Sequence, residues 1–266
     1  MAATGFGQIV SVVVTFASLP LFIHLLGKPG FEDWTLLGSI PATLALNDLG
    51  FGMAATAEMT QRVAREDRQG ALRVFQSCWV LVSCVSVLAF ILLFPFAVWG
   101  PWTGWVRLAQ LDSNGARLAA SLMILLMLGQ QQLSLIAAAY KSDGLYARVT
   151  VIENWQRLLQ YVVGFGCCFY ARTVTSFVVG FVITYLAFVV FMAFDLRRQR
   201  PWISWGKSHA SWDEVKPLIK PALSFAAYPF GIALNLQAMI WVINLTLGPV
   251  QGYWSAMRTL SRAVIQ

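Results

Sequence analysis

The run VTSFVVGFVITYLAFVVFMAF at residues 174–194 contains no charged residue and no proline. A helix needs about 20 mostly apolar residues to cross the hydrocarbon core of a bilayer, and this run is long enough. Comparable runs recur along the whole chain of 266 residues, separated by clusters of charged residues. Strands of a membrane barrel would alternate between apolar and polar residues. The continuous runs therefore predict membrane-spanning helices.

We expect an all-α, polytopic membrane bundle of about eight spans. Residues 1-195 are expected to form a first lobe of six helices, 196-221 a cytoplasmic linker, and 222-266 the incomplete start of a second lobe. The expected spans are Phe6–Leu26, Trp34–Met59, Phe75–Trp99, Leu118–Tyr140, Ile152–Tyr170, Val174–Phe194, Leu223–Leu247 and an eighth that begins near Val250 and is still running at Gln266. Similar Leu, Gly and Pro signals at residues 25–30 and 245–249 suggest a parallel repeat of a six-helix unit.

The composition supports this class of protein. Hydrophobic residues make up 58% and charged residues 12%, against about 45–50% and about 25% in soluble domains. The mean hydropathy is +0.65. These values exclude an ordinary soluble enzyme, and disordered chains are poor in apolar residues. The net charge of +7 is typical of basic cytoplasmic loops, so we expect no nucleic-acid partner.

The distribution of basic residues predicts the orientation. Segments 61–74, 141–157 and 195–220 hold thirteen Lys and Arg residues, whereas the loops on the other side hold four. Basic loops stay on the cytoplasmic side, so we expect a cytoplasmic N-terminus. No cleavage pattern of a signal peptide follows the first run. In the linker, residues 211–214 predict a capping box that opens a short helix, interrupted by Pro217 and Pro221.

Polar groups inside spans are costly and usually face the bundle interior or a water-filled cavity. Asp48 lies near the centre of the expected second span, where it either lines a substrate or proton pathway or bonds a neighbouring helix. At least one amide of residues 130–132 must face a partner or a cavity, and Arg258 and Arg262 share one helix face. Glu153 and Arg157 have the spacing of a structural helix pair. The candidate substrate-binding residues are Asp48, Asn47, Gln131, Asn235, Gln237 and Arg258.

Several kinds of chemistry have no support in the sequence. No G-x-x-x-x-G-K-[ST] motif is present, so ATP hydrolysis is not expected. His24 and His209 fall on opposite sides of the membrane in the expected topology, and the four cysteines lie in apolar runs without metal spacing. The longest outer loop, at about 100–117, is short for a membrane enzyme of glycan assembly. We therefore expect no enzyme activity, no cofactor and no metal site.

Three stretches resemble the oligosaccharide-lipid flippases, the polysaccharide-biosynthesis branch of the multidrug/oligosaccharidyl-lipid/polysaccharide exporter superfamily. They are residues 20–27 (PLFIHLLG), residues 47–54 (NDLGFGMA) running into 62–67 (RVARED), and residues 247–262 (LGPVQGYWSAMRTLSR). The resemblance implies a two-lobed transporter that moves a polyprenyl-pyrophosphate-linked oligosaccharide across the bacterial inner membrane by alternating access, for cell-surface polysaccharide assembly such as O-antigen, capsule or exopolysaccharide. The chain would then be truncated after its first lobe.

The resemblance also implies roles and partners. Asp48 would couple H⁺ or Na⁺, the amides would bind sugar, and Arg258 would pair with pyrophosphate. The partners would be the lipid-linked oligosaccharide, membrane lipids and, for a truncated chain, a second copy or another chain. Two alternatives remain: a cation-coupled multidrug antiporter of the same superfamily, or a membrane subunit without transport activity of its own.

Overall fold

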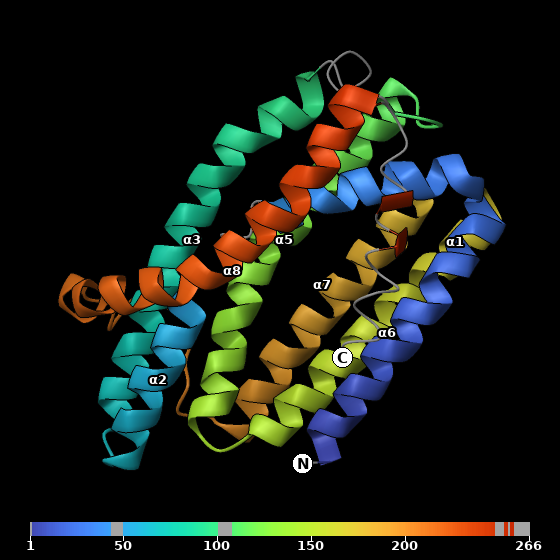
Figure 1. Ribbon diagram of the computed structural model, residues 1–266. Coiled ribbons are helices and arrows are strands. Elements are labelled where there is room, and N and C mark those ends of the chain that lie inside the picture. Colours follow the sequence, from blue (N-terminus) through green and yellow to red (C-terminus); the bar gives the residue numbers. More distant parts are fainter. Residues whose placement is uncertain (1, 44–49, 101–107, 248–252, 255, 258–266) are drawn as a thin grey trace.

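The computed structural model describes residues 2–43, 50–100, 108–247, 253–254 and 256–257 (Figure 1). Within these ranges all regular secondary structure is helical, and no strand occurs. The elements are α1 (Ala2–Thr43), α2 (Phe51–Ala64), α3 (Arg68–Trp99), α5 (Ser113–Ser142), α6 (Tyr146–Ala171), α7 (Val174–Gln199) and α8 (Trp212–Leu247). The predicted all-α helical bundle is confirmed.

Four helical segments of the described part have the length and composition needed to cross a membrane. They are Gly5–Ser39, Arg68–Trp99, Ser113–Ser142 and Val174–Gln199. The helix α6 does not meet this criterion, because Arg148, Glu153, Arg157 and several amides interrupt its apolar residues. Its polar residues have a defined place inside the bundle, as described below.

The first predicted span ends where expected, whereas the second differs from the observed helices. Gly27 has φ 71° and ψ 178° and breaks α1, so the chain turns there (Figure 1), close to the predicted end at Leu26. The expectation of one continuous helix over residues 34–59 is wrong at Gly50, which has φ 70° and precedes the first residue of α2. The left-handed conformation is readily accessible to glycine and ends a right-handed helix. Candidates Asn47 and Asp48 lie outside the described residues.

Gly50 also permits a close contact between two distant parts of the chain. A Cβ atom at Gly50 would lie 1.9 Å from the carbonyl oxygen of Ala222 in α8. Only a residue without a side chain fits at this distance. The start of α2 therefore packs directly on the backbone of α8.

The helix α5 lies at the centre of the core and contacts α2, α3 and α7. Its buried face contains many alanines, which allow neighbouring helices to approach closely. Larger side chains fill the space near the break in α1. There Phe22 lies 4.7 Å from Phe177 and 5.4 Å from Trp34, measured between ring centroids.

A buried carboxylate fixes the second half of α1. Asp33 is fully buried and accepts three backbone hydrogen bonds from the segment that leads into α5. The donors are the N–H groups of Ala109, Gln110 and Leu111, at 2.7, 2.8 and 2.8 Å. Since bonds to a charged acceptor are stronger than neutral ones, Asp33 anchors residues 28–43 to the bundle.

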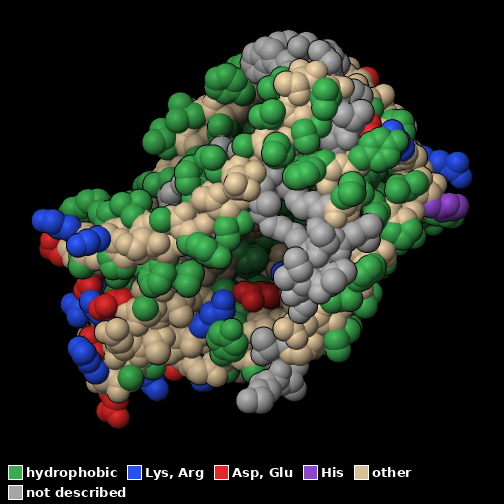
Figure 2. Space-filling model, viewed as in Figure 1, with side chains coloured by type: hydrophobic (Ala, Val, Ile, Leu, Met, Phe, Trp, Pro, Cys, Tyr) green, Lys and Arg blue, Asp and Glu red, His purple; other side chains and the backbone are tan. Residues whose placement is uncertain are grey.

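Charged residues gather at one end of the bundle, over α2 and the start of α8 (Figure 2). Arg62 donates to Glu58 at 2.8 Å and to Glu214 at 2.7 Å. The hydrogen bond that Arg62 donates to Glu214 is the main reason that the pKa of Arg62 is raised above its ordinary value. Residues 204–211 also bond to Gln76 and Ser77 of α3. The linker is therefore docked on α2 and α3.

The helix start predicted in the linker is confirmed in part. The hydroxyl of Ser211 accepts the N–H of Asp213 at 3.3 Å, and α8 begins at Trp212. The expected interruption at Pro217 and Pro221 is wrong, because α8 continues through both prolines to Leu247. Prolines weaken a helix by removing N–H donors, but here α8 packs against α2 and α3. Figure 1 shows α8 changing direction after its first turns.

Candidate functional site

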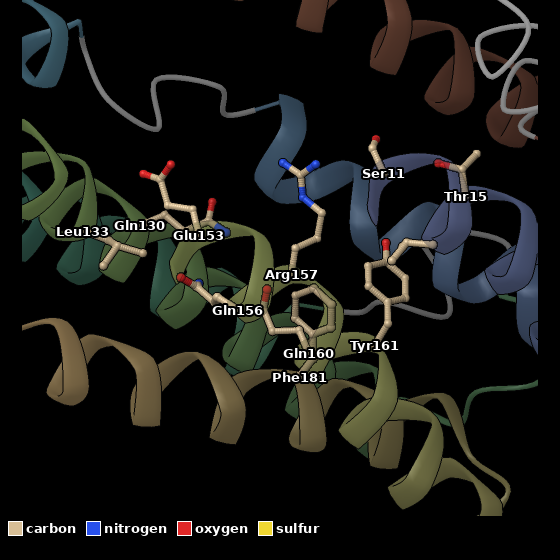
Figure 3. A pocket seen from close by; sticks show the side chains of 11 residues that line it. Ser11, Thr15, Gln130, Leu133, Glu153, Gln156, Arg157, Gln160, Tyr161 and Phe181 are labelled. Atoms are coloured by element: carbon tan, nitrogen blue, oxygen red, sulfur yellow. The ribbon is translucent and has the colours of Figure 1, made fainter. Parts of the chain in front are cut away.

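A polar cavity of about 520 Å³ lies among α1, α5, α6 and α7. Figure 2 shows a hollow on this face of the molecule, and Figure 3 shows the cavity from close by. The side chains that line it are Ser11, Val14, Thr15, Gln130, Leu133, Glu153, Gln156, Arg157, Gln160, Tyr161 and Phe181. Most of them carry hydrogen-bonding groups, which is unusual for space between apolar helices.

The helix α6 supplies most of the polar lining. Glu153, Gln156, Arg157 and Gln160 are spaced i, i+3, i+4 and i+7, so they project from one face of the helix. In Figure 3 they follow one another along α6, and Ser11 and Thr15 of α1 lie to the right of Arg157. This face lines a cavity because α1, α5 and α7 enclose the space in front of it.

The charges in the cavity are not paired as the sequence suggested. Glu153 lies 3.8 Å from Lys141 of α5, and no ion pair within 4.0 Å joins it to Arg157. The expectation of a structural Glu153–Arg157 pair is therefore wrong. Lys141 reaches Glu153 because the chain reverses between α5 and α6, which brings the end of one helix beside the start of the next (Figure 1).

Two side chains of the cavity have donors without a partner among the described residues. Arg157 is exposed and makes no ion pair with the described residues. Gln160 is only 6% exposed, and its Nε2 has no hydrogen-bond partner in the described part of the chain. A buried donor without a partner is costly. The cavity is thus suited to a ligand that offers acceptor oxygens or negative charge.

The residues predicted to bind substrate have mixed positions. Asn47, Asp48 and Arg258 lie outside the described residues, as does the side chain of Gln237. Asn235 is exposed on α8. The substrate-binding roles of these residues stay predictions.

The three consecutive glutamines of α5 face different partners. Gln131 is buried, and its Oε1 accepts a hydrogen bond from Ser86 of α3 at 2.8 Å. Gln132 donates to Ser83 of the same helix at 3.2 Å. Gln130 instead lines the cavity. The prediction that at least one of the three faces a partner or a cavity is confirmed.

Sequence reasoning missed the role of α6. The signal was present: Glu153, Gln156, Arg157 and Gln160 recur at helical spacing within an expected span. Glu153 and Arg157 were interpreted as a helix pair, and the face that all four residues share was not singled out. Only the arrangement of the neighbouring helices identifies this face as a cavity wall.

No protein-family model matches the sequence, and a search of curated proteins found no match. Solved structures do match. A multidrug resistance MATE family transporter of the MOP superfamily in an inward-facing conformation is similar over 95% of this chain and 60% of its own, with a TM-score of 0.72 and 13% identity. An outward-facing conformation of such a transporter matches with a TM-score of 0.66 and 14% identity, over 99% of this chain and 65% of its own.

The chain has a MATE-like fold. A MOP superfamily transporter from Pyrococcus furiosus is also similar, with a TM-score of 0.61 and 13% identity over 99% of this chain and 64% of its own. For that protein, reversed polarity of the binding pocket suggests a different function. The chain thus spans less than two thirds of these solved proteins. Together with the four long apolar helices, the MATE-like fold establishes a multi-pass membrane protein.

Proposed function

We propose that this chain supplies one lobe of a transporter that moves a polyprenyl-pyrophosphate-linked oligosaccharide across the bacterial inner membrane by alternating access. The observation that carries the proposal is the pair of available donors, Arg157 and Gln160, in the wall of a polar cavity. Arg157 and the Nε2 of Gln160 offer donors, while the carboxylate of Glu153 is balanced by Lys141. Pyrophosphate presents only acceptor oxygens when ionised, and guanidinium groups bind such oxygens strongly. The hydroxyls and amides of the lining suit a sugar.

We place the N-terminus on the cytoplasmic side. The charged residues at one end of the bundle (Figure 2) support this orientation, since basic segments are retained in the cytoplasm. In this orientation the N-terminal turns of α1 and α6 lie in the inner leaflet. Asp48, Asn47, Asn235, Gln237 and Arg258 remain proposed substrate contacts, and unchanged transport in D48N and R258A would contradict the roles of Asp48 and Arg258.

Substituting Arg157 by Gln should weaken binding of polyprenyl pyrophosphate. A hydrogen bond to a charged group contributes about 1.5–3 kcal/mol, so the expected loss is about tenfold to a hundredfold in affinity. Binding is measured by native mass spectrometry of the purified protein in nanodiscs. Arg198→Gln is the matched control, because Arg198 is exposed near the end of α7. Equal affinity of the two variants would contradict the proposal.

A cation-coupled multidrug antiporter is the second candidate. It is favoured by the structural similarity to multidrug resistance transporters and by a carboxylate, Glu153, in the cavity wall. A carboxylate that binds and releases a proton is a plausible coupling group.

Glu153→Gln distinguishes the two functions. In an antiporter this variant should lose export of the lipophilic cation ethidium from cells, since Gln cannot exchange a proton. In a lipid-linked oligosaccharide transporter it should retain polyprenyl pyrophosphate binding, because Glu153 is not a donor. Asp213→Asn, which neutralises an exposed carboxylate on α8, is the control. Ethidium export by the wild type that Glu153→Gln abolishes would favour the antiporter.

A further inference from the structure

We infer that the substrate enters the lobe sideways between α1 and α6, with its hydrocarbon chain held in a groove between α6 and α7 and its polar head in the cavity. The inference rests on the function proposed above. It adds a site for the lipid chain and a route for the head group.

The groove is an apolar depression of about 430 Å³. It is lined by Ile152, Trp155, Leu159, Ala187, Phe188 and Phe191. Trp155 is 46% exposed and Phe191 50% exposed, so the groove is open to the surroundings of the bundle. A lining of aliphatic and aromatic side chains suits a hydrocarbon chain, and only the indole N–H of Trp155 could donate to a polar head.

The groove and the cavity occupy different faces of the same helix. Ile152, Trp155 and Leu159 follow one i, i+3, i+7 series, whereas Glu153, Gln156 and Gln160 follow another. At 3.6 residues per turn the two series project in different directions. One helix therefore presents an apolar surface outward and a polar surface inward, which matches the two halves of a lipid-linked sugar.

The helix α1 lies against α6 (Figure 1) and separates the two surfaces. We call this contact the seam; it consists of Phe6 and Gly7 of α1 with Asn154 and Trp155 of α6. The rings of Phe6 and Trp155 are 6.0 Å apart. A Cβ atom at Gly7 would lie 2.8 Å from Nδ2 of Asn154. Trp155 belongs to both the seam and the groove.

A second polar recess joins the seam to the cavity. It measures about 350 Å³ and is lined by Gly7, Gln8, Ser11, Val12, Thr150, Asn154 and Arg157. Ser11 and Arg157 also line the cavity. A polar path therefore runs from the seam to the guanidinium of Arg157, next to the groove that would hold the chain.

The seam can separate without breaking a hydrogen bond or an ion pair. Among the described residues, no hydrogen bond or ion pair joins residues 5–26 of α1 to α6, so only packing holds them together. Opening the seam breaks no polar contact, and a polar head that passes through meets the side chains of the recess. Since the seam lies near the N-terminal ends of both helices, the proposed orientation places it in the inner leaflet, where the substrate would be loaded.

The first test closes the seam with a reversible disulfide. Gly7→Cys and Asn154→Cys are combined in protein whose native Cys78, Cys84, Cys167 and Cys168 are replaced by Ser, and each single substitution is a control. In nanodiscs, the oxidised pair should bind polyprenyl pyrophosphate at least about tenfold more weakly than the reduced pair. Binding of inorganic pyrophosphate, which needs no lateral route, should stay unchanged.

Each other outcome has a defined meaning. Equal polyprenyl pyrophosphate binding by the oxidised and reduced pairs would overturn the lateral route. If oxidation abolished binding of both polyprenyl pyrophosphate and inorganic pyrophosphate, the lateral route would also be overturned, because the disulfide would then act on the cavity itself. If the reduced and wild-type proteins bind neither ligand, the proposed function fails and the inference fails with it.

The second test fills the groove. Ala187→Trp places a large ring between α6 and α7, whereas Val190→Trp adds the same ring at a position of α7 that is 69% exposed and outside the groove. Only Ala187→Trp should weaken polyprenyl pyrophosphate binding, with inorganic pyrophosphate binding unchanged in both variants. Equal affinities of the two variants for the lipid would overturn the groove as the site of the chain.

Discussion

Substituting Gly50 by Ala should prevent the chain from reaching its native packing. The new Cβ would lie 1.9 Å from the carbonyl oxygen of Ala222, which is backbone and cannot rotate away. The residue would also hold φ 70°, a conformation that costs a non-glycine residue about 1–2 kcal/mol. With the overlap added, the loss should exceed about 4 kcal/mol. It is measured as the monodisperse fraction and the Tm of detergent-purified protein.

Gly144→Ala is the matched control for Gly50→Ala. Gly144 has φ 79°, but a Cβ there meets no atom within 4 Å. This variant should therefore show only the conformational cost of about 1–2 kcal/mol. If both variants lose the same stability, the contact between Gly50 and Ala222 does not contribute, and the packing of α2 on α8 described above is wrong.

Substituting Asp33 by Asn should produce the second large loss of stability. The carboxylate accepts three backbone N–H groups at 2.7–2.8 Å. Asn has a single acceptor oxygen, and its NH₂ group would face at least one of these donors. A buried donor left without an acceptor costs about 1–3 kcal/mol, and the charge of the acceptor is lost as well. We expect a decrease of about 2–4 kcal/mol, seen as a lower Tm.

Asp112→Asn provides the comparison for Asp33→Asn. Asp112 is exposed and caps α5 through one hydrogen bond from the N–H of Gly115, at 3.0 Å. Since Asn and Asp are equally good N-caps, the Tm should hardly change. A Tm of Asp33→Asn as high as that of Asp112→Asn would show that Asp33 does not anchor the second half of α1.

The break at Gly50 shows a limit of predicting helix boundaries from hydropathy. Residues 34–59 form a long apolar run, and hydropathy alone predicts one helix there. Gly50 lies inside that run, has a φ of 70° and lies against the backbone of α8. A glycine in an apolar run is compatible with either a straight helix or a break, so the sequence around it could not decide between them.

The cavity illustrates the same limit for function. Gln131 was the expected cavity residue of α5, but it bonds Ser86 of α3, and the adjacent Gln130 lines the cavity instead. Neighbouring residues on a helix point about 100° apart. Their roles therefore depend on how the helix is rotated against its neighbours.

The sequence by itself determined that this is an all-α membrane protein, because hydropathy adds up along the chain and each apolar run must be shielded from water wherever it lies. It also located the C-terminal ends of α3 and α6 to within one residue, whereas most helices begin several residues before the predicted starts. The tertiary structure alone decided which polar residues meet. Lys141 rather than Arg157 pairs with Glu153, and α6 separates a polar cavity from an apolar groove. These contacts join residues from several helices, so they exist only once the helices have packed.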